Sequence, residues 1–517
     1  MNQRIGIDVG GTNTDAVLVD DSSVIGGVKS PTTADVTGGV RQALADLIAL
    51  CGPTAKNVDC VMIGTTHFVN AVVQRRGLNK IAALRITLPG SASLTPFVDW
   101  PKDLAVLVNE GVFCVAGGNE FDGQPVVPLD EDAVVKAAHA MRDAGITSVG
   151  ITASFSPLNS DCEDRAAEIV ARECPGIRIT CSHALGRIGL LERENATLLN
   201  AALLDLADDT AQAFRDALDD SGIKAPLYIT LNDGTVTSAD IARKYPVYCF
   251  ASGPTNSMRG AAFLSGIDDA IVCDVGGTTA DIGCLATGFP REANNVVEVG
   301  GVRTLFRMPD LVSIGIGGGT KVDDAPLTVG PESVGFRLPE EARVFGGSQL
   351  TLTDVAVAKG LMDVGDKSLV KELPDELAST ALEMAFQRIS DTVDRMKIDS
   401  IDVPLIAVGG GAALVPEEIP GISKVHRVPN HAVANAVGAA IAQISGEADQ
   451  VFQDLSRDAA LEAAHQIAVE NAVKAGADRE TIKTIEMEDL PLAYLPGHSI
   501  RARVRVVGDI ARSSDNA

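Results

Sequence analysis

The stretch Asp8-Val9-Gly10-Gly11-Thr12-Asn13-Thr14-Asp15 decides the fold of this chain, because it returns as Asp274-Val275-Gly276-Gly277-Thr278-Thr279-Ala280-Asp281. Six of the eight positions are identical, and each copy follows one apolar strand and opens into another. A single glycine pair after a strand is equally typical of an ordinary hairpin turn. The duplication instead predicts two related halves whose turns face one ligand.

The glycines of the two turns predict a receptor for phosphate. Glycine adopts positive φ and leaves its backbone N–H groups uncovered, so a glycine turn forms a concave site for anions. Neither turn belongs to a GxxxxGK[ST] sequence or to a GxGxxG that runs from a strand into a helix, which excludes P-loop and Rossmann sites. The predicted phosphate contacts are the four central residues of each turn: Gly10, Gly11, Thr12, Asn13, Gly276, Gly277, Thr278 and Thr279.

Asp8 and Asp274 stand at the two strand ends and suit a metal ion better than a phosphate. A carboxylate repels phosphate, so the predicted role of each is to hold a hydrated Mg²⁺ that bridges to the phosphates. ATP with Mg²⁺ is therefore the predicted ligand pair. Asp15 and Asp281 either join this site or brace their turns through local hydrogen bonds. The predicted catalytic residues are Asp8, Asp274, Thr12 and Thr278.

Two further glycine-rich stretches are predicted to reach the nucleotide. The first, residues 313–320, offers Gly317 and Gly318. In the second, an apolar strand over residues 405–408 ends in three glycines, where bare backbone suits a base and a ribose. A closely packed turn from strand to helix is the alternative for this second stretch. Its glycines are Gly409, Gly410 and Gly411.

Polar residues after the strand predicted over 58–64 are the candidates for substrate contact. They lie at the start of a helix predicted over 68–77, where the first half can turn polar groups toward a cleft. The threonines also suit a helix N-cap, and the histidine also suits a purely structural hydrogen bond. These candidates are Thr65, Thr66, His67 and Asn70.

Composition narrows the class of protein and its surroundings. A chain of 517 residues with 46% apolar content exceeds one hydrophobic core, which predicts at least two domains. The net charge of −26 argues against nucleic acid or an anionic membrane as a partner. It does not exclude ATP, because surface charges are screened beyond about 8 Å whereas the turn amides touch phosphate directly. Nine cysteines without a CxxC pair, and no signal or membrane segment, predict a cytoplasmic protein with reduced thiols.

The order of the hairpins, strands and helices resembles the superfold of actin, hexokinase and Hsp70. Helices are predicted over 36–51, 129–144 and 190–221 among the strands. The resemblance implies an α/β fold of two ribonuclease-H-like halves around a nucleotide cleft. The predicted divisions are an N-terminal half (1–180), a C-terminal half with insertions (181–445) and a small α/β appendage (446–517). In the appendage, residues 447–477 are predicted to be helical, 484–487 and 500–507 to be strands, and 513–517 a frayed tail.

A narrower resemblance, over residues 4 to 445, is to the hydantoinase/oxoprolinase family. It implies an A-type subunit that works with a B-type partner subunit or domain and hydrolyses a cyclic amide at the expense of ATP, the amide being a hydantoin, a lactam or a 5-oxoproline-like ring. The motifs that carry it are Gly64-Thr65-Thr66 with Asn70-Ala71, Glu192-Arg193-Glu194-Asn195-Ala196-Thr197 with Asn200-Ala201, Ser252-Gly253-Pro254, Asp274-Val275-Gly276-Gly277-Thr278, Ser313-Ile314-Gly315-Ile316-Gly317-Gly318-Gly319, Val329-Gly330-Pro331-Glu332-Ser333 and Thr351-Leu352-Thr353-Asp354.

The chemistry that this implies begins at the amide oxygen. An unstrained amide is a poor electrophile, so transfer of the γ-phosphoryl group to the carbonyl oxygen would create a leaving group before water attacks. Two other functions fit the same cleft. A small-molecule kinase would phosphorylate a hydroxyl with an aspartate as base. A switch without enzymatic activity would use ATP only to close the cleft.

Overall fold

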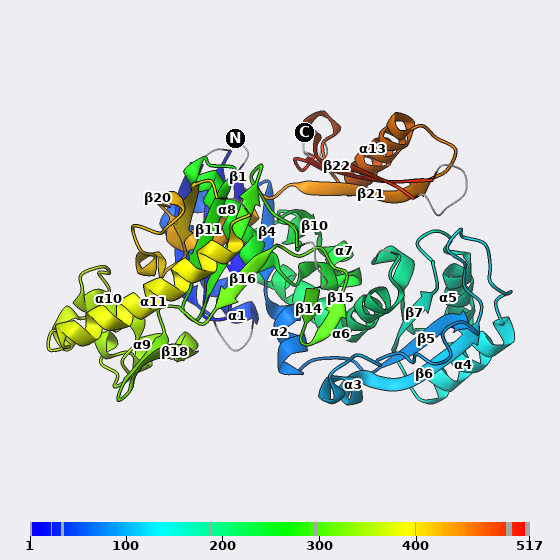
Figure 1. Cartoon of the computed structure of the whole chain (residues 1–517), viewed down its shortest axis with the longest axis horizontal. Coiled ribbons are helices and arrows are strands. Elements are labelled where there is room, and N and C mark those ends of the chain that lie inside the picture. Colours follow the sequence, from blue (N-terminus) through cyan, green and yellow to red (C-terminus); the bar gives the residue numbers. More distant parts are fainter. Residues whose placement is uncertain are drawn as a thin grey trace.

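The two copies of the repeated stretch form equivalent hairpins in two sheets of the computed structural model, which describes residues 3–21, 23–32, 36–186, 188–293, 297–398, 400–492 and 499–511 (Figure 1). The larger sheet has nine strands, in the order β22 (Lys483–Pro491), β23 (Ile500–Gly508), β21 (Ile444–Phe452), β10 (Val236–Ser238), β9 (Leu227–Thr230), β4 (Cys60–Thr65), β1 (Gln3–Val9), β2 (Asn13–Asp20) and β3 (Ser23–Pro31). The second sheet contains β13 (Phe289–Pro290), β12 (Ala280–Ala286), β11 (Ala270–Val275), β19 (Val403–Val408) and β20 (Ile422–Arg427), with β16 (Leu311–Ile314) paired to β12. The predicted tail, 513–517, lies outside the described residues.

Both sheets share one topology. Three antiparallel strands, β3-β2-β1 or β13-β12-β11, are followed by two parallel strands, β4 and β9 or β19 and β20. The hairpin registers also match, because Asp8 lies opposite Asp15 and Asp274 lies opposite Asp281. This is the ribonuclease-H-like arrangement in duplicate, so the predicted fold class is confirmed.

The helices pack against these two sheets and against the smaller units described below. They are α1 (Val36–Cys51), α2 (His67–Gln74), α3 (Lys102–Val108), α4 (Glu131–Asp143), α5 (Asp161–Glu173), α6 (Leu190–Asp220), α7 (Ala239–Lys244), α8 (Ser252–Ser265), α9 (Leu338–Glu341), α10 (Leu352–Ala358), α11 (Asp375–Met396), α12 (Ala434–Ala440) and α13 (Arg457–Lys474). The helices predicted over 36–51, 129–144 and 190–221 are α1, α4 and α6. Among the described residues, none of these helices combines the length and the apolar character needed to cross a membrane.

Two helices join the two parts of the molecule that are built on these sheets, which we call the two lobes. Helix α12 packs on β1 and β2, whereas α8 packs on β11 and β19. They cross so closely that a Cβ on Gly438 would stand 1.8 Å from the carbonyl oxygen of Asn256, and a Cβ on Gly260 would stand 1.9 Å from that of Ala434. Only glycine permits this contact between backbones. The crossing therefore sets how the two sheets lie against each other.

Two smaller units stand away from this centre. Parallel strands β6 (Asn109–Ala116), β5 (Ile81–Leu88), β7 (Ser148–Ala153) and β8 (Arg178–Cys181) form a sheet with its own apolar core under α4 and α5, at the lower right of Figure 1. The two-stranded sheet of β17 (Thr320–Asp324) and β18 (Leu327–Ser333) lies with α9, α10 and α11 at the left. A second small pair, β14 (Val297–Val299) and β15 (Val302–Thr304), packs near α6.

The C-terminal segment differs from the prediction at its start. Residues predicted as the beginning of a helix over 447–477 form β21, and only 457–474 are helical, as α13. The reason is a two-residue period, in which Glu447 and Asp449 lie on one face opposite arginines of β23. The strands predicted over 484–487 and 500–507 are confirmed as β22 and β23. Because the nine-stranded sheet takes strands from all three predicted segments, the domain boundaries stay a prediction.

Candidate nucleotide-binding site

The two glycine hairpins meet at the junction of the lobes. A Cβ on Gly277 would contact the Thr12 side chain at 3.4 Å, so one turn lies directly against the other. Each turn closes on itself, with the Gly10 N–H donating to Asn13 O at 3.0 Å and the Gly276 N–H donating to Thr279 O at 2.9 Å. The two turns therefore present one shared surface.

The backbone amides at the tips of the hairpins remain available. Among the described residues, no hydrogen-bond acceptor pairs with the N–H groups of Gly11, Thr12, Gly277 or Thr278. These positions are exposed or partly exposed. Four uncovered donors on two touching turns are what a phosphate chain requires.

Asp8 is a buried carboxylate with one oxygen left over. Its side chain is 3% exposed, and Oδ2 accepts a hydrogen bond from Asn435 Nδ2 at 3.1 Å. Oδ1 has no hydrogen-bond partner among the described residues. Burial, and then the nearby Asp15 carboxylate, raise the pKa of Asp8 to about 7, against the effect of the Asn256 and Asn435 amides. A buried oxygen without a partner marks a place where a cation would be stabilised.

Asp274 occupies the equivalent place in the second lobe. Its Oδ2 accepts a hydrogen bond from Ser257 Oγ at 2.6 Å, and burial raises the pKa of the carboxyl group. Asp281 lies across the hairpin, where burial raises its pKa to about 6 and the Ser313 hydroxyl opposes the shift. The negative charge of the Asp274 carboxylate also raises the pKa of both Asp8 and Asp281, so the three carboxylates interact electrostatically.

Asp15 has a cation of its own. Lys29 Nζ, on β3, donates to both Asp15 oxygens at 2.8 and 2.6 Å. Of the two roles that the sequence leaves open for Asp15, this pair favours bracing of the first hairpin.

The residues fit a hydrated Mg²⁺. Carboxylate oxygens are the ligands that this ion prefers, and it usually keeps several waters beside one or two carboxylates and substrate phosphates. Asp8 supplies the unpartnered oxygen, and Asp274 the corresponding carboxylate of the other lobe. Asn435 and Ser257 hold one oxygen of each. The site assignments themselves stay predictions.

The third glycine stretch lies directly behind the second hairpin. The Gly318 N–H donates to Gly276 O at 3.0 Å, and the Gly317 N–H donates to Thr320 Oγ1 at 2.7 Å. A Cβ on Gly317 would stand 2.7 Å from the Thr278 backbone. Gly317 and Gly318 therefore support the turn with amides that the protein already uses, and their predicted contact with nucleotide is untested.

The fourth glycine stretch reaches the same place from β19. Gly409 has φ of +85°, and a Cβ there would stand 2.2 Å from Asp274 Oδ1. The Gly411 N–H donates to Val275 O at 2.7 Å, whereas Gly410 is exposed with open space around it. These glycines thus border the second hairpin, and their predicted role toward the nucleoside stays a prediction.

The predicted substrate residues line up at the start of α2. Thr65 is fully buried, and its hydroxyl accepts a hydrogen bond from the His67 N–H at 3.1 Å. Asn70 Nδ2 donates to Thr66 Oγ1 at 3.2 Å, and burial lowers the pKa of His67. A Cβ on Gly253, in the Ser-Gly-Pro motif, would contact Thr66 at 3.3 Å. The Thr65 hydroxyl is already used for local structure, and a role in substrate binding stays untested for all four.

Three residues of the site were not among those predicted from the sequence. Asn435 and Ser257 lie on the crossing helices α12 and α8, and Lys29 lies on the third strand of the first hairpin sheet. A lone amide among alanines, as in Ala434-Asn435-Ala436, is the one hint available in the sequence. Their partners are far away in the chain and are brought close only by folding.

Two ribonuclease-H-like lobes that each bring a glycine hairpin and a strand-end aspartate to one junction define a class of two-lobed α/β proteins. Within that class, the model of the hydantoinase/oxoprolinase N-terminal region matches residues 4–174, and the hydantoinase/oxoprolinase model matches residues 193–366. Together they cover about two thirds of the chain. The chain therefore belongs to the hydantoinase/oxoprolinase family.

The relatives include proteins with stated activities. The chain is 27% identical to caprolactamase subunit alpha of Pseudomonas jessenii, over 70% of this chain and 55% of the relative. It is also 27% identical to the acetophenone carboxylase gamma subunit of Aromatoleum aromaticum, over 69% and 53%. The chain thus spans about half the length of these two relatives. The crystal structure of the ATP-dependent caprolactamase from P. jessenii superposes with a TM-score of 0.79 at 20% identity, covering 98% of this chain and 88% of that one.

The raised pKa of Asp8 predicts a pH-dependent loss of stability. A carboxyl group whose pKa is 3.8 unfolded and about 7 folded binds more protons in the folded state, so its stabilisation is complete at low pH and is lost as pH rises toward 7. Without nucleotide or Mg²⁺, we expect this group to lower the free energy of unfolding by about 3 kcal/mol between about pH 5 and about pH 8. Urea unfolding of the parent and of Asp8→Asn measures the effect, which the variant should lack. Parallel pH profiles for the two proteins would contradict the assignment.

Proposed function

We propose that this chain binds Mg²⁺–ATP between its two hairpins and activates the carbonyl group of a cyclic amide for hydrolysis, as the A-type subunit of an enzyme with a B-type partner. The observation that carries the proposal is the pair of touching hairpins, with four available amides beside Asp8 and Asp274. The names of the relatives support the ATP dependence and the lactam substrate class. Both curated relatives are named as subunits, which supports a partner. Nine free thiols support the cytoplasm as its location.

In this mechanism the chain chiefly positions the phosphate chain of ATP and helps to neutralise its charge. The amides of Gly11, Thr12, Gly277 and Thr278 orient the phosphate chain, so that the γ-phosphorus lies in line with the carbonyl oxygen. When bound, Mg²⁺ supplies positive charge that offsets the charge on the phosphates. Asn435 and Ser257 fix the carboxylates of Asp8 and Asp274, which would hold that ion. The protein itself forms no covalent bond to the substrate in this mechanism.

The bonds change in a fixed order. The bond from the γ-phosphorus to ADP breaks as the bond to the amide oxygen forms. Water adds to the carbon, the ring C–N bond breaks toward the protonated nitrogen, and an acyl phosphate remains. A second water releases inorganic phosphate. The same first step would phosphorylate the oxygen of a ketone enolate, and the similarity to the acetophenone carboxylase gamma subunit makes a ketone the second candidate substrate.

The test is a substrate-dependent ATPase assay. We expect hydantoins, lactams or 5-oxoproline to raise phosphate release from Mg²⁺–ATP at least about tenfold over the basal rate when the partner subunit is present, because substrate completes the in-line geometry. Phosphate release and ring-opened product are measured together, with aryl ketones and bicarbonate as a separate arm. A stable phosphorylated product would indicate a small-molecule kinase instead. Nucleotide binding without any turnover, with all substrates and the partner, would favour a conformational switch.

A further inference from the structure

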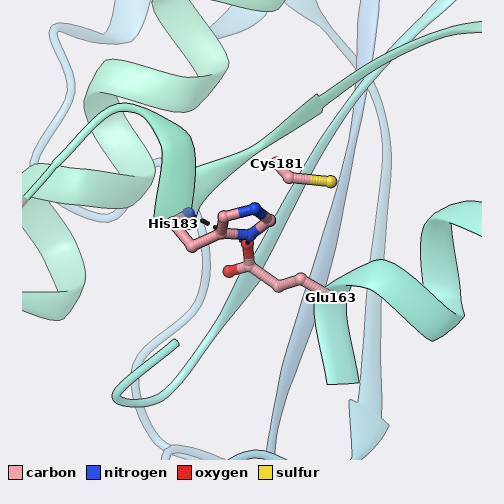
Figure 2. A group of neighbouring side chains, drawn as sticks. All are labelled: Glu163, Cys181 and His183. Atoms are coloured by element: carbon pink, nitrogen blue, oxygen red, sulfur yellow. Dashed lines mark hydrogen bonds and ion pairs between the residues drawn. The ribbon is translucent and has the colours of Figure 1, made fainter. Parts of the chain in front are cut away.

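A second group of potential ligands lies far from the hairpins in the sequence, where β8 leads toward α6. Glu163 on α5, Cys181 at the end of β8 and His183 directly after it bring a carboxylate oxygen, a sulfur and a ring nitrogen within 4.8 Å of one another (Figure 2). Cysteine sulfur, histidine nitrogen and carboxylate oxygen are each among the ligands that zinc takes in proteins. The proposed nucleotide chemistry uses none of the three.

The carboxylate of this group is held in place by donors on one side. Glu163 is fully buried, and its Oε1 accepts hydrogen bonds from the Ala153 N–H at 2.7 Å and from the Ser182 hydroxyl. Ser182 Oγ in turn accepts from Arg193 Nε at 2.9 Å. Carboxylates that bind metals are commonly fixed by outer hydrogen bonds of this kind. Oε1 is thus the anchored oxygen, and Oε2 is the one turned to the histidine.

The histidine ring has a carboxylate at each nitrogen. Its Nδ1 lies 2.7 Å from Glu163 Oε2, which also accepts the His183 backbone N–H at 3.0 Å. Its Nε2 lies 3.7 Å from Asp164 Oδ1. A histidine that binds a metal through one nitrogen almost always offers the other N–H to a carboxylate, which fixes the tautomer and the ring. Asp164 stands where that outer carboxylate is needed if Nδ1 binds the ion.

We propose that Glu163 Oε2, His183 Nδ1 and Cys181 Sγ bind a zinc ion, with Asp164 as the outer partner of His183 Nε2. The ion takes the place of the proton between Nδ1 and Oε2. Binding removes the proton of the Cys181 thiol to solvent and moves the ring proton of a neutral His183 to Nε2, so the thiolate and the imidazole are both ready to bind. Three protein ligands leave one position for water or another ligand.

A cavity lies beside His183, next to the proposed zinc ion. His183 also lines a cavity of about 570 Å³, which lies between the four-stranded unit that contains β8 and the strand β21. Apolar side chains form part of its wall, and Arg307 and Arg501 form another part. These arginines are paired with acidic residues of the same wall, Glu447 and Asp449. An ion at His183 therefore stands at the margin of a cavity large enough for a small organic molecule.

Zinc titration of the full chain tests the proposal. We expect one zinc ion per chain after dialysis, measured by plasma mass spectrometry, and competition with a chromophoric chelator for the affinity. Cys181→Ser and His183→Gln should each lower the affinity more than about 100-fold, and Asp164→Asn about 10- to 100-fold, because it touches only the outer N–H. Cys162→Ser and His139→Gln are the matched controls, since neither residue belongs to the group, and both should bind zinc like the parent.

Two measurements on the unmodified chain keep the test independent of folding of the variants. Cobalt in place of zinc should produce a thiolate charge-transfer band, and bound zinc should protect Cys181, but not the exposed Cys114, from alkylation as read by peptide mass spectrometry. No stoichiometric metal, or equal affinity in Cys181→Ser and Cys162→Ser, would overturn the proposal. None of these measurements depends on ATPase activity, so a failure of the zinc proposal can be distinguished from a failure of the proposed function.

Discussion

Asp8→Asn is expected to lower the rate of substrate-dependent ATP hydrolysis at least about 100-fold while the fold is retained. Asparagine keeps the size of the side chain and removes the negative charge that offsets the metal ion. Asp8 Oδ1 is a buried carboxylate oxygen that has no hydrogen-bond partner among the described residues, so the variant removes no hydrogen bond that the fold makes to this oxygen. The loss should appear in kcat more than in KM for the amide, because the carboxylate contacts neither the ring nor its substituents.

The measurement is phosphate release under saturating Mg²⁺–ATP, with the free energy of unfolding determined on the same preparations. Asp20→Asn, on the same hairpin but away from the turn, is the matched control and should keep parental activity. Because the raised pKa of Asp8 is a cost in the ligand-free protein, the Asp8 variant should also be more stable than the parent at about pH 8. An Asp8→Asn enzyme with full Mg²⁺-dependent turnover would refute the metal assignment.

Gly438→Ala is expected to cause the largest loss of stability, about 3 kcal/mol or more. The added Cβ would stand 1.8 Å from the carbonyl oxygen of Asn256, which is backbone on the facing helix and cannot rotate away. Separation of α8 from α12 would relieve the clash, but these helices carry Asn435 and Ser257, so both strand-end carboxylates would lose their hydrogen bonds. Nucleotide affinity should therefore fall together with stability.

Chemical unfolding, with nucleotide binding by calorimetry, measures both effects. Gly90→Ala is the matched control, because its added Cβ would meet only Thr87 O at an ordinary 3.5 Å and its φ is not in the left-handed region. That control should change the free energy of unfolding by less than about 1 kcal/mol. Parental stability in Gly438→Ala would mean that the helices do not cross as closely as described.

The fold class and the place of the hairpins could be predicted because both rest on local order in the chain. Ile5 and Ile7 alternate with Gly6 and Asp8 on β1, so one face of the strand enters the apolar core while Gly6 admits α12 on the other. The prediction failed at residues 447–452, where charged residues suggested an exposed helix. There the arginines that pair with Glu447 and Asp449 lie far away in the chain, on β23 and at Arg307, and local propensity carries no information about them.

By itself, the sequence determined that this protein has two equivalent hairpins with bare amides and strand-end aspartates, because glycine turns and strand periodicity act over a few residues. Only the tertiary structure decided that the hairpins touch, that Asn435 leaves Asp8 with a single unpartnered oxygen while Ser257 holds Asp274, and that Glu163 meets Cys181 and His183. These contacts join residues that are distant in the chain. They depend on the crossing of α8 and α12 and on the packing of α5 against β8, which no short stretch of sequence encodes.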